Sequence, residues 1–381
     1  MAFLNKNTAL ALAALVACGG AAATEDYDLR YAPGYGGADM SAPFEGGWVF
    51  QAHAYAYSGN VRGTTVQSTD LTAAVAAALG ANLGPAGATT LIRTNEQINV
   101  YGLLPRLSYM SSTTFLGATL GGTVLLPLVT KGSTASVTSV GSTTLSGVAA
   151  ALPSANQAAL IGLVNAGVTQ GAGALASENS NKTFGPGDLE FSPILRWSTE
   201  ATQTLFILTT VAPTGDYDKN RAANPSAGKF WTFRPAVQFS YIGDGWDVGT
   251  RVAYSYNTRN TQTQYKSGSY LNWDLAAMKS VSESTRVGLS GYAVDQLNKD
   301  STRLASAADY VAEFGAANAS VAAAREAATL DEKGRVFGVG PEIAYIHGAG
   351  DYLVEGRVMR EFGAQTRPKG FTAFVTLSKP F

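Results

Sequence analysis

The chain has 381 residues, of which only 14% are charged, and its formal net charge at pH 7 is -1. Soluble globular domains usually contain about 25% charged residues, and the near-neutral charge without any Lys/Arg run argues against a nucleic-acid partner. The body of the chain also has no uninterrupted apolar stretch of about eighteen residues, the length that a membrane-spanning helix needs. Low charge without helical spans favours a β-barrel.

Residues 1–23 have the features of a secretory signal peptide. A short apolar core, Ala9 to Ala17, precedes a small-residue cleavage site at Ala21 to Ala23. Cys18 is the single cysteine of the chain, so cleavage would leave a mature protein without thiol, disulfide or cysteine metal site. The alternative is lipidation at Cys18, because Leu15-Val16-Ala17-Cys18 resembles a lipobox.

Residues 24–47 are rich in Gly and Pro, as in Pro33-Gly34-Tyr35-Gly36-Gly37, and show no periodicity. This composition predicts an irregular periplasmic arm that could plug the lumen of a barrel formed by residues 48–381. The plug idea rests on analogy with other barrels.

The rest of the chain predicts an antiparallel transmembrane β-barrel of about 12 strands, because apolar and polar residues alternate with a period of two. The predicted strands are Trp48 to Tyr57, Ile98 to Tyr109, Phe115 to Val129, Asp188 to Ser198, Thr204 to Ala212, Phe230 to Tyr241, Trp246 to Asn257, Gly268 to Lys279, Thr285 to Gln296, Arg335 to Ile346, Tyr352 to Phe362 and Gly370 to Phe381. The last one ends on an aromatic residue, Phe381, which favours a closing barrel strand that the barrel assembly machinery recognises.

The links between these strands alternate in length. Most links after odd-numbered strands are long, as in 58–97, 130–187 and 297–334, whereas links such as 242–245 and 347–351 are short. Short periplasmic turns and long extracellular loops are typical of outer-membrane barrels. The pattern therefore places both ends of the chain on the periplasmic side.

Three long links have helical features: Asp70 to Leu79, Leu145 to Val168 and Ser306 to Leu330. They contain too few polar residues for freely solvated loops. They could fold over the barrel mouth as an apolar lid, or they could pack on one another or against lipopolysaccharide. Both interpretations stay open.

The polar alternate positions of the strands predict the lumen lining. The charged residues among them are Arg106, Glu190, Arg196, Arg234, Asp247, Arg251, Asp274, Arg286, Glu342, Glu355, Arg357 and Glu361. All the cations are arginines, which hold carboxylates bidentately and stay charged when desolvated. They could brace the wall as ion pairs, or they could form a charge ladder along a solute pathway.

Several motifs resemble one family, the outer-membrane transporters named after the meta-pathway of phenol degradation. They are Pro213-Thr214-Gly215-Asp216-Tyr217, Phe230-Trp231-Thr232-Phe233-Arg234-Pro235, Tyr265-Lys266-Ser267-Gly268, Gly291-Tyr292-Ala293-Val294-Asp295-Gln296, Gly338-Val339-Gly340-Pro341 and Lys379-Pro380-Phe381. The resemblance implies an outer-membrane barrel linked to uptake of hydrophobic or aromatic compounds. The link 130–187 looks longer than this family leads us to expect.

The leading hypothesis is passive uptake of a small hydrophobic molecule through a constriction lined by Arg234, Arg251 and Glu342. The expected partners are outer-membrane lipid, lipopolysaccharide and the solute, with no cofactor or metal. The alternative is a structural or adhesive surface protein, because long outer loops serve either role. An enzyme is disfavoured: the two histidines, His53 and His347, lie in a strand and a short turn, and no Gly-x-Ser-x-Gly motif occurs.

Overall fold

The computed structural model describes residues 29–41 and 46–381, apart from residues 82, 179, 317–318, 320–321, 324–325, 328–329, 331 and 349. The predicted signal peptide, Cys18 and the first part of the arm lie outside the described residues. None of the helices described here is both long enough and apolar enough to cross a membrane.

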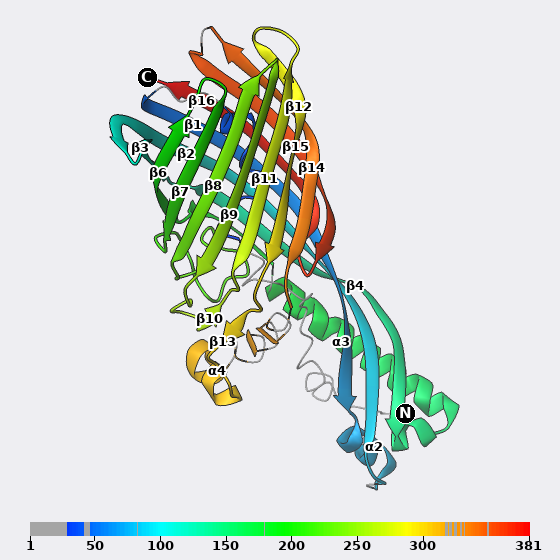
Figure 1. Ribbon diagram of the computed structural model, residues 1–381. Helices are drawn as coiled ribbons and strands as arrows, with labels where there is room; N and C mark the ends of the chain where they lie inside the picture. Colours follow the sequence, from blue (N-terminus) through cyan, green and yellow to red (C-terminus); the bar gives the residue numbers. More distant parts are fainter. Residues whose placement is uncertain are drawn as a thin grey trace.

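Fourteen antiparallel strand segments form one sheet that closes on itself, because β1 pairs with β16 on one side and with β2 on the other (Figure 1). The segments are β1 (Gly47–Asp70), β2 (Ala86–Phe115), β3 (Ala118–Leu125), β4 (Leu128–Gly147), β5 (Asn181–Pro186), β6 (Leu189–Ser198), β7 (Thr202–Ala212), β8 (Thr232–Gly243), β9 (Trp246–Asn257), β11 (Tyr270–Ser280), β12 (Thr285–Gln296), β14 (Arg335–His347), β15 (Tyr352–Gln365) and β16 (Lys369–Pro380).

The closed sheet is a twelve-stranded barrel, as predicted, because two of its strands are each split into two segments. β3 and β4 pair with successive parts of β2, and the break between them contains Pro127, which has no N–H for the ladder. β6 and β5 pair in turn with β3 and β4, and their break lies at 187–188. Each of the twelve predicted strands is present, and the ranges of β9 and β12 agree with the prediction residue for residue.

The predicted loops 58–97 and 130–187 are wrong in part, because 58–70, 86–97, 130–147 and 181–186 are strand. β1 continues to Asp70, β2 begins at Ala86 and β4 reaches Gly147. These extensions are rich in Thr, Ser and Val, which suit an extended backbone. Beyond the barrel these strands do not face lipid, so they need no apolar side chains on an outward face. The alternation of apolar and polar residues that marks the other strands is therefore weak here.

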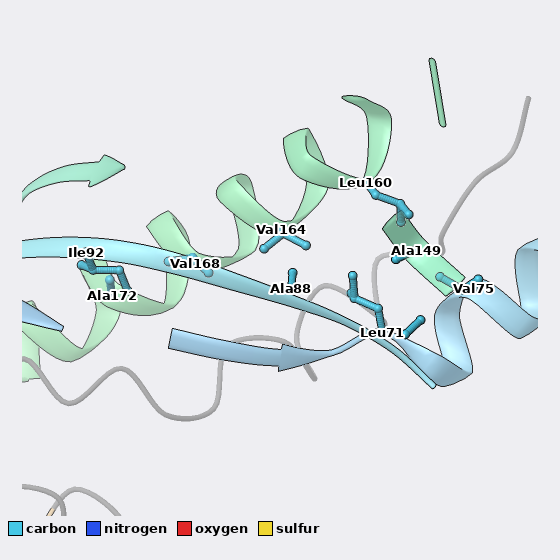
Figure 2. Packing of buried hydrophobic residues seen from close by; sticks show 10 residues of the cluster. Leu71, Val75, Ala88, Ile92, Ala149, Leu160, Val164, Val168 and Ala172 are labelled. Carbon is cyan, nitrogen blue, oxygen red and sulfur yellow. The ribbon is translucent and has the colours of Figure 1, made fainter. Parts of the chain in front are cut away.

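The extensions of β1, β2 and β4 form a ribbon that projects beyond the barrel (Figure 1) and carries α2 (Thr72–Leu79), η3 (Val148–Ala151) and α3 (Ser154–Glu178). Leu160, Val164, Val168 and Ala172 recur every four residues, so they share one face of α3. This face packs on the ribbon, next to residues such as Ile92 (Figure 2). The helical links can be interpreted either as a lid over the barrel mouth or as segments that pack on their neighbours. The position of α3 favours the second interpretation.

Along the barrel strands, one alternate set faces out and the other faces the lumen. On β9 the side chains of Trp246 and Val252 are exposed, whereas Asp247, Arg251 and Ser255 are buried. Before β1, η2 (Ala38–Met40) lies inside the barrel. The other long-loop elements are the short pair β10 (Tyr265–Lys266) and β13 (Ser301–Thr302), and α4 (Ala307–Phe314), which begins with a capping box from Ser306 and Asp309.

Candidate solute pathway in the barrel lumen

The segment 29–41, hereafter the arm, lies inside the barrel and is bound to its wall through its own backbone. The N–H of Ala38 donates to Glu342 (2.7 Å), and the N–H of Asp39 donates to Glu355 (3.0 Å). The carbonyl of Met40 accepts a hydrogen bond from Gln238 (2.9 Å). Carboxylates and an amide of the wall thus supply the partners that an irregular buried backbone requires.

The glycines of the arm allow this close approach. A Cβ atom at Gly37 would lie 2.4 Å from Nη1 of Arg357, whose side chain is fully buried and held by ion pairs. At Gly34 the backbone has φ +77°, and a Cβ atom would lie 2.4 Å from Cε of Met359. The Gly-rich composition of the arm therefore fits the narrow space between arm and wall.

The arm is held at one side by an ion pair between Asp39 and Arg106. The two side chains are 1% and 16% exposed, and Oδ2 of Asp39 lies 3.1 Å from Nη2 of Arg106. Burial disfavours the charged carboxylate, but Arg106 and other nearby cations outweigh this effect and hold the pKa of Asp39 below its ordinary value. Gln51 also hydrogen bonds Arg106 and fixes the guanidinium in place.

A second anchor is the cluster of Arg357, Glu355 and Glu342, whose side chains have no exposed surface. The guanidinium of Arg357 pairs with Glu355, and its Nη1 lies 3.8 Å from Glu342. It also donates to the carbonyls of Gly34 (3.0 Å) and Tyr35 (2.7 Å). Two carboxylates and one cation need additional donors in a dry interior, and the arm supplies them.

Two tyrosines complete the seat of the arm. Tyr31 donates a hydrogen bond to Asp274, which also accepts from the N–H of Gly34 (3.2 Å). The hydroxyl of Tyr35 lies 3.1 Å from Nε2 of His53, whose other ring nitrogen is 3.0 Å from Oγ1 of Thr376. The buried His53 therefore links the arm to the barrel wall through Tyr35 and Thr376.

Most of the predicted charged residues gather around the arm. Besides those described above, Arg234 pairs with Glu190 (3.1 Å) and lies over the ring of Tyr31, and Arg251 donates to Gln238. The three residues predicted to line a constriction, Arg234, Arg251 and Glu342, all face the arm and its neighbours. The lumen between them is therefore filled by the arm.

Four of the predicted residues lie away from the arm. Asp247 and Arg286 form an ion pair, and both lie near the short turns, at the beginning of β9 and β12. Arg196 is half-buried near the end of β6, also close to a short turn. Glu361 accepts hydrogen bonds from Tyr57 and Tyr292 at the opposite end of the lumen.

A cavity of about 630 Å³ lies in the lumen between the arm and the wall. Much of its apolar lining comes from four neighbouring strands, β2, β3, β6 and β7. Six aliphatic side chains of this lining are hereafter called the aliphatic wall: Leu104, Leu125, Ile194, Leu205, Ile207 and Val211. The cavity thus lies between the arm on one side and the aliphatic wall on the other.

Sequence reasoning missed the aliphatic wall because it searched the inward positions for charges. In the middle of β7 both alternate sets are apolar, with Leu205 and Ile207 facing the lumen and Phe206 and Leu208 facing out. A barrel strand that is apolar on both faces is unusual where the lumen is polar. The apolar run Leu205-Phe206-Ile207-Leu208 is the sequence signal from which this wall could have been predicted.

Comparisons with known proteins agree with this architecture. Residues 78–377 match the sequence profile of the family described as "Putative MetA-pathway of phenol degradation". An outer membrane channel from Pseudomonas putida F1 superimposes with a TM-score of 0.54 at 14% identity, over 92% of this chain and 100% of that one. No curated protein sequence matches the chain significantly.

Two further solved structures are more distant. The CymD monoaromatic hydrocarbon channel has 10% identity and a TM-score of 0.37, over 91% of this chain and 94% of that one. The P. putida toluene transporter TodX has 10% identity and a TM-score of 0.32, over 90% of this chain and 92% of that one. These scores are too low to support an argument about this chain.

Proposed function

The chain belongs to the family described as "Putative MetA-pathway of phenol degradation" and forms an outer-membrane β-barrel, and from this premise we propose that it is a channel for passive uptake of small hydrophobic or aromatic compounds. The observation that carries the proposal is the cavity between the arm and the aliphatic wall. Its volume of about 630 Å³ lies within the range of about 300–1,000 Å³ that is usual for small-molecule sites. An apolar solute gains by leaving water for such a surface.

We propose that the arm, within residues 24–47, acts as the plug of this channel. Its backbone and side chains are bound from β1, β2, β8, β11, β14 and β15. A hydrated ion would have to pass the residues that bind the arm, whereas an apolar solute would move along the aliphatic wall. The plug would thus favour hydrophobic over polar solutes.

The charged lumen residues would then have three roles. Arg106, Glu190, Arg234, Arg251 and Arg286 line the cavity and would border the solute pathway. Asp274, Glu342, Glu355 and Arg357 would mainly hold the arm. Asp247 and Arg196 would border the periplasmic exit, near the short turns.

The experiment that tests the proposed site is a crystallographic soak with bromobenzene, whose bromine is located by anomalous scattering. We expect a bromine peak between Ile207 and the arm. Replacement of Leu205 and Ile207 by asparagine should remove this peak, whereas asparagine at the outward-facing Phe206 should leave it. Bromine only at the outer barrel surface would contradict the proposal.

Two finer points follow from this assignment. The chain would act without catalysis, since uptake through a pore requires no reaction. Phe381, whose N–H donates to the carbonyl of Trp48 where β16 meets β1, would be the residue that the barrel assembly machinery recognises.

A structural or adhesive role is the second candidate, and the projecting ribbon with α3 favours it. Deletion of α3, residues 154–178, distinguishes the two roles. A loss of cell attachment with unchanged solute uptake would support adhesion, whereas unchanged attachment would remove its basis.

A further inference from the structure

Four neighbouring strands each carry one exposed cation on the outward face near the long-loop end of the barrel. They are Arg360 on β15, Lys369 on β16, Arg62 on β1 and Arg93 on β2, hereafter the cation row. This end is opposite to the short turns, so the cation row faces the outer leaflet of the membrane and the region just above it.

The strand register makes the cation row continuous. Arg360 lies opposite Phe371, two residues from Lys369, and Lys369 lies opposite Asn60, two residues from Arg62. Arg62 in turn lies opposite Asn95, two residues from Arg93. Each cation is therefore a diagonal neighbour of the next on the same face, at a separation of roughly 7–8 Å.

No carboxylate within the part of the chain that the structure describes forms a salt bridge with any member of the row. By contrast, the nearby Arg335 lies opposite the outward-facing Asp295. Four adjacent like charges repel one another, and an anionic partner would relieve that repulsion. The row thus differs from the lumen, where arginines are matched with carboxylates.

Exposed aromatic side chains lie beside the cation row. The guanidinium of Arg360 lies 5.8 Å from the ring centroid of Phe371, which is 54% exposed. Phe362, which is 52% exposed, stacks on Phe337 with 5.7 Å between ring centroids. The surface therefore offers cations for an anionic headgroup and rings for acyl chains.

We propose that the cation row is a binding site for the phosphorylated lipid A part of lipopolysaccharide. Lipid A combines acyl chains with two phosphates at the level of the outer headgroups, which matches rings and cations side by side. The site crosses the seam where β16 closes against β1, because Lys369 lies on β16 and Arg62 lies on β1. Arg62 is two residues beyond Asn60, the last residue of β1 that pairs with β16. This proposal is independent of which solute passes the lumen.

The test compares lipid A binding to the purified full-length protein in detergent, with EDTA present to remove bridging divalent cations. The probes are bisphosphorylated lipid A and the same lipid after phosphatase treatment. The variant replaces all four cations by glutamine (Arg62→Gln, Arg93→Gln, Arg360→Gln, Lys369→Gln). The matched control, Lys279→Gln with Lys379→Gln, removes cations at the short-turn end of β11 and β16.

We expect wild type and control to bind bisphosphorylated lipid A equally and to prefer it over the dephosphorylated form. Each cation removed should weaken binding about fivefold, as expected for a cation at an anionic lipid surface. Equal binding of both lipids by the wild type would overturn the proposal. So would unchanged affinity in the fourfold variant. If that variant does not fold, the same criterion applies to the four single variants and to the salt dependence of wild-type binding.

Discussion

The carboxylate of Asp39 in the arm lies 3.1 Å from the guanidinium of Arg106 on β2, and both side chains are largely buried. Removal of one partner of a buried pair typically costs about 3 to 5 kcal/mol, because the other charge is left uncompensated. This pair is therefore the contact whose loss should most easily release the arm from the wall.

The first prediction concerns that pair. Asp39→Asn should unseat the arm and raise single-channel conductance in planar bilayers several-fold, towards that of a variant lacking residues 29–41. Asp309→Asn in the capping box of α4 is the matched control and should leave conductance unchanged. Equal conductance of wild type, Asp39→Asn and the truncated variant would contradict a plugging arm.

A second prediction follows from the lowered pKa of Asp39. Stabilisation by a carboxylate with a depressed pKa is complete above its unfolded value of about 3.9 and is lost only as the pH falls through the lower folded value. The difference in conductance between wild type and Asp39→Asn should therefore stay constant between pH 7 and pH 5 and shrink only in stronger acid. Loss of that difference with a midpoint near pH 6 would contradict the lowered pKa of Asp39.

A third prediction tests the steric fit of the arm. Gly37→Ala would place a Cβ atom 2.4 Å from Nη1 of Arg357, so the arm should move and conductance should rise. Gly173→Ala on α3 has no neighbouring atom within 4 Å and is the control. Trypsin accessibility of Arg30 reports the movement directly, and protection equal to wild type would contradict the tight fit.

A fourth prediction separates the ribbon from the barrel. Val164→Asp puts a charge into the apolar contact of α3, where Val164 is 1% exposed, so the ribbon should lose protection in hydrogen exchange. Leu163→Asp on the exposed side of α3 should have little effect. In both variants the barrel strands should stay protected, and loss of their protection would show that the ribbon is part of the barrel's cooperative unit.

Local sequence pattern was sufficient to predict the barrel strands, because lipid outside and lumen inside impose a period of two on each strand. It failed for the ribbon, where neither environment acts and the predicted loops are paired strands. Local pattern also identified the inward arginines, but it could not pair them. Asp39 and Arg106 are 67 residues apart, and their contact depends on where the arm enters the closed barrel.

The aliphatic wall shows the same limit in another form. The apolar run on β7 is visible in the sequence, yet only the barrel register reveals that Leu205 and Ile207 face the same cavity as Leu104 on β2. The arm supplies the opposite side of that cavity. No local pattern predicts a space that is bounded by segments so distant in the chain.

We propose passage of a small hydrophobic compound across the outer membrane along the aliphatic wall. Its most direct test is uptake of radiolabelled phenols, alkylbenzenes, terpenoids and long-chain acids by a deletion strain that carries wild type or Leu205→Asn with Ile207→Asn. We predict that wild type restores uptake of at least one of these classes and that the double variant, although folded, takes it up about tenfold more slowly, equivalent to about 1.4 kcal/mol. Equal uptake of every solute with and without the protein would contradict passage along the aliphatic wall.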